Sequence, residues 1–176
     1  MRTLGPGSVS SLLKSVLDVV YIGLMVVAGA IALAGLAALL FRLDPAVFKG
    51  VAIEGASGEV LTRPEVLAGL FAAIGLYLTG VLVILNRLRK VFVTLTAGDP
   101  FHPDNVARLR LVGALLAGLE IMRYLVWVGS LALVPGIDRT GPSISLSGWF
   151  SILVVFVLAE VFREGARLRR DAELTI

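Results

Sequence analysis

The chain has 176 residues, of which 57% are hydrophobic and 16% charged, with a mean hydropathy of +0.93 and a formal net charge of +3. Soluble domains carry about 25% charged residues, so this composition excludes an ordinary water-soluble domain and indicates membrane spans. The absence of cysteine excludes disulfides, thiolate metal sites and a cysteine nucleophile, and the single histidine, His102, argues against an all-protein zinc site.

Four apolar blocks predict four membrane-spanning helices, at residues 16–41, 66–85, 111–134 and 146–162. Their lengths are close to the roughly 17–25 residues that a transmembrane helix needs. The first block is too long for the core of a signal peptide, so we expect it to be retained as an anchor. The predicted fold is one all-α integral membrane domain covering residues 1–176.

The first loop, residues 42–65, contains two short apolar runs on either side of Gly55-Ala56-Ser57-Gly58. This pattern could form a small β-hairpin at the membrane surface. Pro64 then lies near the first turn of the second helix, where proline is tolerated.

The second loop, residues 86–110, predicts a helical hairpin that extends helices 2 and 3 into the cytoplasm. Helix 2 should continue to about Ala97 and end at Gly98, a residue suited to the position just past a helix end. Pro103 should begin helix 3, with Asp104 in the first turn complementing the helix dipole.

The third span carries two charges, Glu120 and Arg123, where lipid should be. Its twelve Leu, Ile and Val residues favour insertion by on the order of 4 to 7 kcal/mol, and the two charges oppose it by roughly 5 to 7 kcal/mol. The charges are three residues apart, so they share a helix face and can pair. The sequence leaves open a structural ion pair, a polar pathway or ligand site, and a pair at a subunit interface.

The distribution of basic residues predicts the orientation. Eleven of the sixteen Lys and Arg residues fall in the N-terminal segment, the second loop and the C-terminal segment, while four fall in the other two loops. Basic segments stay in the cytoplasm, so we expect a multi-pass inner-membrane protein with both termini inside. Helix 4 should continue as a polar helix from Arg163 to Arg170, within a cytoplasmic tail of residues 163–176.

Two acidic residues, Asp18 and Glu160, fall near the inner ends of their spans. Lys14 and Arg163 are at helical pairing distances from them, which favours interfacial salt bridges over a proton or cation relay that would include Glu120.

The cytoplasmic side gathers a set of mostly basic residues that could attract anionic lipid or bind an acidic partner. The residues assigned to this surface are Arg87, Arg89, Lys90, Asp99, Phe101, Asn105, Arg108, Arg110, Arg163, Arg167, Arg169, Arg170 and Leu174. No base-reading motif, phosphate-binding glycine loop or plausible catalytic triad is present. We therefore expect no direct binding of nucleic acid, no cofactor, no metal and no enzymatic activity.

Two stretches resemble a known family. They are Ala97–Arg110, which reads AGDPFHPDNVARLR, and Leu158–Ile176, which reads LAEVFREGARLRRDAELTI. With the four-span layout, they resemble the bacterial family of small inner-membrane proteins known as domain of unknown function 2975. Its members show a GDPF-x-P-x-N turn and an end like VFRxGxxLRxDxDLT. Glu173 conservatively replaces the acidic residue before Leu-Thr, and Ile176 stands where valine is frequent.

The resemblance implies no established catalytic activity. Genes of the family often lie beside one for a short Cro/CI-like helix-turn-helix protein, which implies a membrane protein that holds or regulates this regulator at the cytoplasmic face. The alternatives are an accessory subunit of a larger membrane complex, or a small oligomeric transporter or ion pathway through Glu120 and Arg123.

Overall fold

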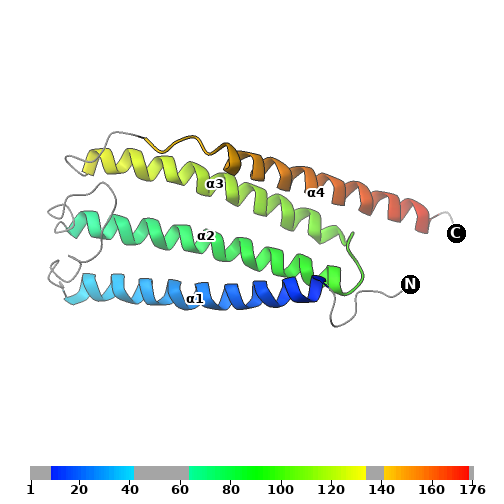
Figure 1. Cartoon of the computed structure of the whole chain (residues 1–176), viewed down its shortest axis with the longest axis horizontal. Helices are drawn as coiled ribbons and strands as arrows, with labels where there is room; N and C mark the ends of the chain where they lie inside the picture. The colour runs from blue at the N-terminus through cyan, green and yellow to red at the C-terminus, as the bar shows by residue number, and fades with distance from the viewer. Residues whose placement is uncertain (1–8, 42–63, 134–140, 175–176) are drawn as a thin grey trace. The chain divides into compact units, whose positions relative to one another are not determined.

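A computed structural model of the chain describes residues 9–41, 64–133 and 141–174, and these form four helices with no strand among them. The helices are α1 (Val9–Phe41), α2 (Pro64–Thr96), α3 (Pro103–Leu133) and α4 (Leu146–Glu173) (Figure 1). All four are long and apolar enough to cross a membrane. The all-α, four-span architecture is confirmed, whereas the β-hairpin was predicted in residues that lie outside the described ranges.

The turn between α2 and α3 follows from local sequence rules. Gly98 has a φ of 81°, in the left-handed region that glycine adopts without steric cost. Its N–H donates to the carbonyl of Leu95 at 3.1 Å, and the N–H of Asp99 donates to the carbonyl of Thr94 at 3.0 Å. These two bonds are the Schellman motif, which satisfies the last carbonyls of a helix. The predicted end of helix 2 at Gly98 is therefore confirmed.

Replacing Gly98 with alanine should isolate the cost of this backbone conformation. No atom lies within 4 Å of the position that a Cβ would take, so the cost comes from the left-handed φ alone. We expect Gly98→Ala to lower the free energy of unfolding by about 1 kcal/mol, measured by titration with SDS in mixed micelles. Gly118→Ala, a helical position with equally open space, should instead be neutral or stabilising by up to about 1 kcal/mol. Equal effects of the two variants would contradict this explanation.

The next two helix starts are capped. Pro103 is the first residue of α3, as predicted, and the ring nitrogen Nδ1 of His102 accepts from the N–H of Asp104 at 3.3 Å. The side chain of Ser145 accepts from the N–H of Gly148 at 3.0 Å and so caps α4. Both contacts satisfy an N–H group that has no partner inside the helix.

The described chain divides into two compact units. The first unit contains Met1–Leu24, Gly80–Gly118 and Ser145–Ile176, and the second contains Met25–Thr79 and Leu119–Ile144. Every described residue that is classed as buried belongs to the first unit. In the second unit, as in the apolar parts of the first, the helices expose large hydrophobic side chains, as expected where lipid takes the place of a protein core.

The core of the first unit joins α2, α3 and α4. Val91, Leu109 and Ala159 form its buried cluster, with Leu95 and Phe162 packed against it. Small residues let the helices approach closely, because a large side chain of one helix can then pack directly against the backbone of its neighbour. A Cβ added at Gly113 of α3 would lie only 3.0 Å from the ring of Phe156 of α4.

Candidate interaction site

One charged side chain from each helix lies at a common level of the first unit, and we call these four residues the charged belt. They are Asp18 (α1), Arg89 (α2), Arg110 (α3) and Glu160 (α4). Arg89 donates to Asp18, and its guanidinium carbon lies 4.5 Å from the ring centroid of Tyr21. Arg110 lies 3.6 Å from Glu160. The belt therefore ties α1 to α2 and α3 to α4.

The contacts between α2 and α3 place these two ion pairs at the same level. The guanidinium of Arg108 donates to the carbonyl of Lys90 at 3.2 Å, and the amide of Asn105 donates to Thr94 at 2.7 Å. In an antiparallel helix pair, this register sets Arg89 opposite Arg110.

The partner of Asp18 differs from the one predicted. We expected Lys14, four residues earlier, but the ion pair that Asp18 forms is with Arg89, 71 residues away. The prediction for Glu160 is confirmed, since Arg163 contacts it in addition to Arg110. These pairs are partly exposed, so each is worth about 0 to 1 kcal/mol if water reaches it.

Beyond the belt lies the part of the first unit that we call the polar end, residues 90–109 and 161–174. At its centre is Asn105, which is 0% exposed. Its amide donates to Thr94 Oγ1 at 2.7 Å and to the carbonyl of Pro100 at 3.1 Å, and its Oδ1 accepts from Arg108 at 3.0 Å. Both amide hydrogens and the amide oxygen are thus used inside the protein.

This burial corrects one assignment. Asn105 was predicted to lie on the partner or lipid surface, but no part of it is accessible. Its role is to hold the turn, because it joins the end of α2, the connecting segment and the start of α3 through one side chain.

The turn is also fastened to α4, which brings together the two stretches that resemble one family. Arg169 of α4 donates to Asp99. The ring of Phe101 packs against that of Phe162, with centroids 5.9 Å apart, and covers Gly165. Asp99 and Phe101, predicted as surface residues, therefore also make contacts within the chain, although the ring of Phe101 stays partly exposed.

Most cations of the predicted surface are paired with acids of the same chain. Arg108 contacts Asp104 at 3.1 Å, and Arg167 contacts Glu164 at 2.9 Å. Arg87 is half-buried, and its Nε has no hydrogen-bond partner among the described residues. The exposed surface of the polar end is therefore a mixture of cations and apolar groups and is less basic than the residue count predicted. Its exposed members include Lys90, Arg163, Arg167, Arg170, Leu168 and Leu174.

The second unit contains the intramembrane pair. Arg123 donates to Glu120 at 2.6 Å, so the predicted pairing of the two charges is confirmed. The same nitrogen of Arg123 donates to the carbonyl of Ser143 at 3.0 Å and to the hydroxyl of Tyr124 at 3.3 Å. The sequence did not reveal the contact with Ser143, because the two residues are 20 positions apart with a loop between them.

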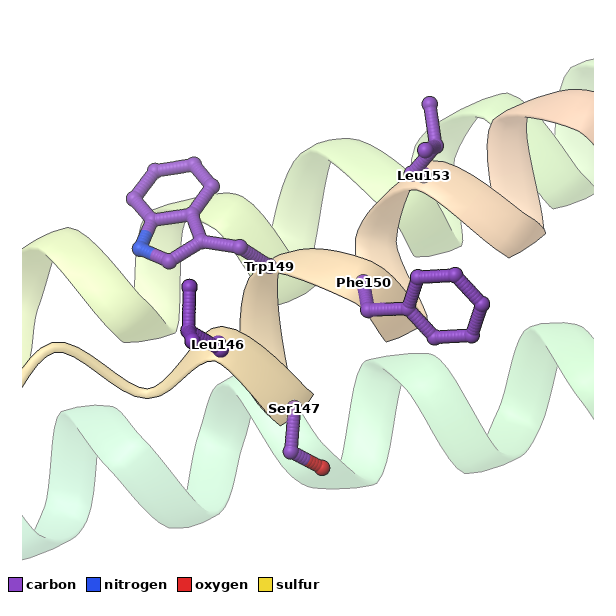
Figure 2. Close-up of a pocket in the computed structure, with 5 residues that line it drawn as sticks. All are labelled: Leu146, Ser147, Trp149, Phe150 and Leu153. Carbon is purple, nitrogen blue, oxygen red and sulfur yellow. The ribbon is translucent and has the colours of Figure 1, made fainter.

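The first turns of α4 surround a shallow apolar depression (Figure 2). It is lined by Leu146, Ser147, Trp149, Phe150 and Leu153. The labelled side chains point in different directions from one helix, and Leu146 and Phe150 are largely exposed. The depression is a surface suited to acyl chains and contains no convergent polar groups, so it gives no candidate active site.

Comparison with known proteins identifies a family. No curated protein and no solved structure matches the chain. The family described as Protein of unknown function (DUF2975) matches residues 51–176, which include the turn, the polar end and three of the four helices. With this match over more than half of its length, the chain, a multi-pass membrane protein, belongs to the DUF2975 family.

Proposed function

We propose that the protein is a non-enzymatic interaction protein of the bacterial inner membrane, with its polar end in the cytoplasm. There it binds and regulates a small helix-turn-helix protein, the kind of regulator whose gene accompanies members of this family.

One observation carries the proposal: the turn of residues 97–110 and the end of α4 are fastened to each other through Asp99–Arg169 and Phe101–Phe162. A fastened end offers a partner a surface that needs little further ordering, which lowers the entropic cost of association.

The exposed face of α4 supplies the contacts. Leu168 is 57% exposed and Leu174 is 86% exposed, although both lie in a polar stretch that the sequence assigns to water. The neighbouring cations Arg167 and Arg170 are exposed as well. Apolar side chains surrounded by arginines match the composition of interaction surfaces, in which a few buried anchors dominate the affinity.

The test is co-purification of the full-length tagged protein from its native membranes, with quantification of the neighbouring helix-turn-helix protein. We expect Leu168→Ser with Leu174→Ser to reduce its recovery about tenfold, which corresponds to a loss of about 1.4 kcal/mol of binding free energy. Val93→Ser is the matched control, because Val93 is an exposed apolar residue of the polar end on a different helix. Failure to recover the helix-turn-helix protein, or equal recovery with the leucine variant and the parent, would refute the proposal.

A further inference from the structure

Measured from the charged belt, the apolar part of α4 is shorter than the corresponding parts of the other three helices. From the charged belt to the far end of each helix there are about 35 Å in α1 (Asp18–Phe41), 38 Å in α2 (Arg89–Pro64) and 35 Å in α3 (Arg110–Leu133), at 1.5 Å per residue. The corresponding length of α4, from Glu160 to Leu146, is only about 21 Å. A hydrocarbon core is about 30 Å thick, so a crossing that begins at the belt extends roughly 9 Å beyond the start of α4.

The chain that precedes α4 makes up this difference without being helical. Residues 141–145 have no regular secondary structure and would span at most about 18 Å when extended. They lie along the second half of α3, since Ser143 contacts Arg123 and a Cβ at Gly141 would lie 3.2 Å from the ring of Trp127. These two contacts fit one extended segment. Gly141 and Ser143 are two extended residues apart, and Trp127 and Arg123 are four helical residues apart, and each separation is about 6 Å.

Non-helical backbone inside a bilayer needs partners for its polar groups, because lipid offers none. Arg123 supplies one, as its guanidinium donates to the carbonyl of Ser143 at 3.0 Å. Glu120 compensates the positive charge of Arg123 at 2.6 Å and is itself only 16% exposed. Arg123 therefore contacts both the carboxylate of Glu120 and the non-helical backbone at Ser143.

We propose that residues 141–145 complete the fourth membrane crossing as extended chain, and that the Glu120–Arg123 pair is a clamp that holds this segment against α3 within the hydrocarbon. This inference does not depend on the proposed function. It gives the intramembrane charges a positioning role at the segment before α4, in place of a pathway for ions.

The proposal predicts the depth of the segment. With the belt at the inner surface of the hydrocarbon core, Arg123 lies about 20 Å along α3 from the belt residue Arg110, and Ser143 should lie roughly 10 Å below the outer surface. The side chain of Ser143 is exposed in the isolated chain, so its protection would come from lipid. Only the Ser143 carbonyl is used in the clamp, so a substitution of its side chain leaves the contact in place.

The absence of cysteine makes the test direct, since a single introduced thiol has no background. The full-length variants Ser143→Cys, Arg170→Cys and Leu125→Cys are placed in lipid nanodiscs, where both membrane faces are open, and labelled with a charged maleimide. Arg170→Cys is the exposed reference, and Leu125→Cys is a lipid-facing reference on α3. We expect Ser143→Cys to react at least about tenfold more slowly than Arg170→Cys and at a rate close to that of Leu125→Cys, since lipid suppresses thiolate formation.

The clamp is tested by adding Glu120→Leu with Arg123→Leu to the Ser143→Cys chain. This double change leaves no unpaired charge and makes the third span more apolar, so insertion is preserved. We expect labelling of Cys at position 143 to accelerate towards the Arg170→Cys rate, while Arg123→Lys, which keeps a charge and a donor, accelerates it less. Rapid labelling of Ser143→Cys in the otherwise unaltered chain would overturn the embedded segment, and unchanged slow labelling in the double variant would overturn the clamp.

Discussion

Asn105→Leu should lower the free energy of unfolding by about 3 kcal/mol, although leucine has the same number of side-chain heavy atoms as asparagine and the same branch at Cγ. The change removes the donor to the Pro100 carbonyl and the acceptor for Arg108, and it leaves these groups without their partner at a position that is 0% exposed. Each group left unsatisfied in this way costs about 1 to 3 kcal/mol. Titration with SDS in mixed micelles gives the loss, and hydrogen exchange at the amides of Gly98 and Asp99 should show that the turn opens first.

Asn105→Asp separates the donors from the acceptor. The carboxylate still accepts from Arg108 but cannot donate to Pro100, so we expect about half of the loss caused by leucine. If leucine were tolerated as well as asparagine, packing alone would explain the buried position, and the hydrogen-bond network would have no structural role.

The helix boundaries could be predicted because their signals are local. Gly98 and Pro103 act through the backbone angle and the missing N–H of the residue itself, so the neighbouring sequence is enough to place the end of α2 and the start of α3. The Glu120–Arg123 pair was likewise predictable, since both residues lie within one turn of one helix.

The contacts between helices could not be predicted, because they depend on register. Asp18 has a lysine four residues away, but the approach of α1 to α2 brings Arg89 to it instead. The sequence predicts Asn105 as a surface residue, because it is polar and lies in a hairpin that is expected to face water. Its burial follows from Thr94 and Pro100, which reach it only when the turn closes.

The predicted interaction surface was inaccurate for the same reason, because contacts between helices change which charges are available. A count of basic residues predicts a basic surface, but many of these residues form ion pairs within the chain. Arg169 pairs with Asp99, and Arg89 pairs with Asp18. Gly165 lies in one of the two stretches that resemble the family, but nothing in the sequence around it indicates why a glycine is needed there. The structure shows that the ring of Phe101 occupies the space that a Cβ at this position would take.

Gly165→Ala should therefore be destabilising, although alanine favours helix over glycine. A Cβ at this position would overlap the ring of Phe101, and that ring also packs against Phe162. The ring must therefore move, or the turn must separate from α4. Overpacking of this kind costs about 1 to 3 kcal/mol, whereas Gly118→Ala at an open helical position should be neutral or stabilising. The loss is measured as the free energy of unfolding in mixed micelles.

A double-mutant cycle identifies the cause. Phe101→Ala alone should destabilise the polar end through loss of its contact with Phe162, but in the Phe101→Ala background the change Gly165→Ala should cost little, because the obstructing ring is gone. The expected coupling between the two sites is on the order of 1 to 2 kcal/mol. Additive effects would mean that Gly165 is required for a reason other than the close approach of Phe101. The explanation that the turn packs against α4 through this contact would then be wrong.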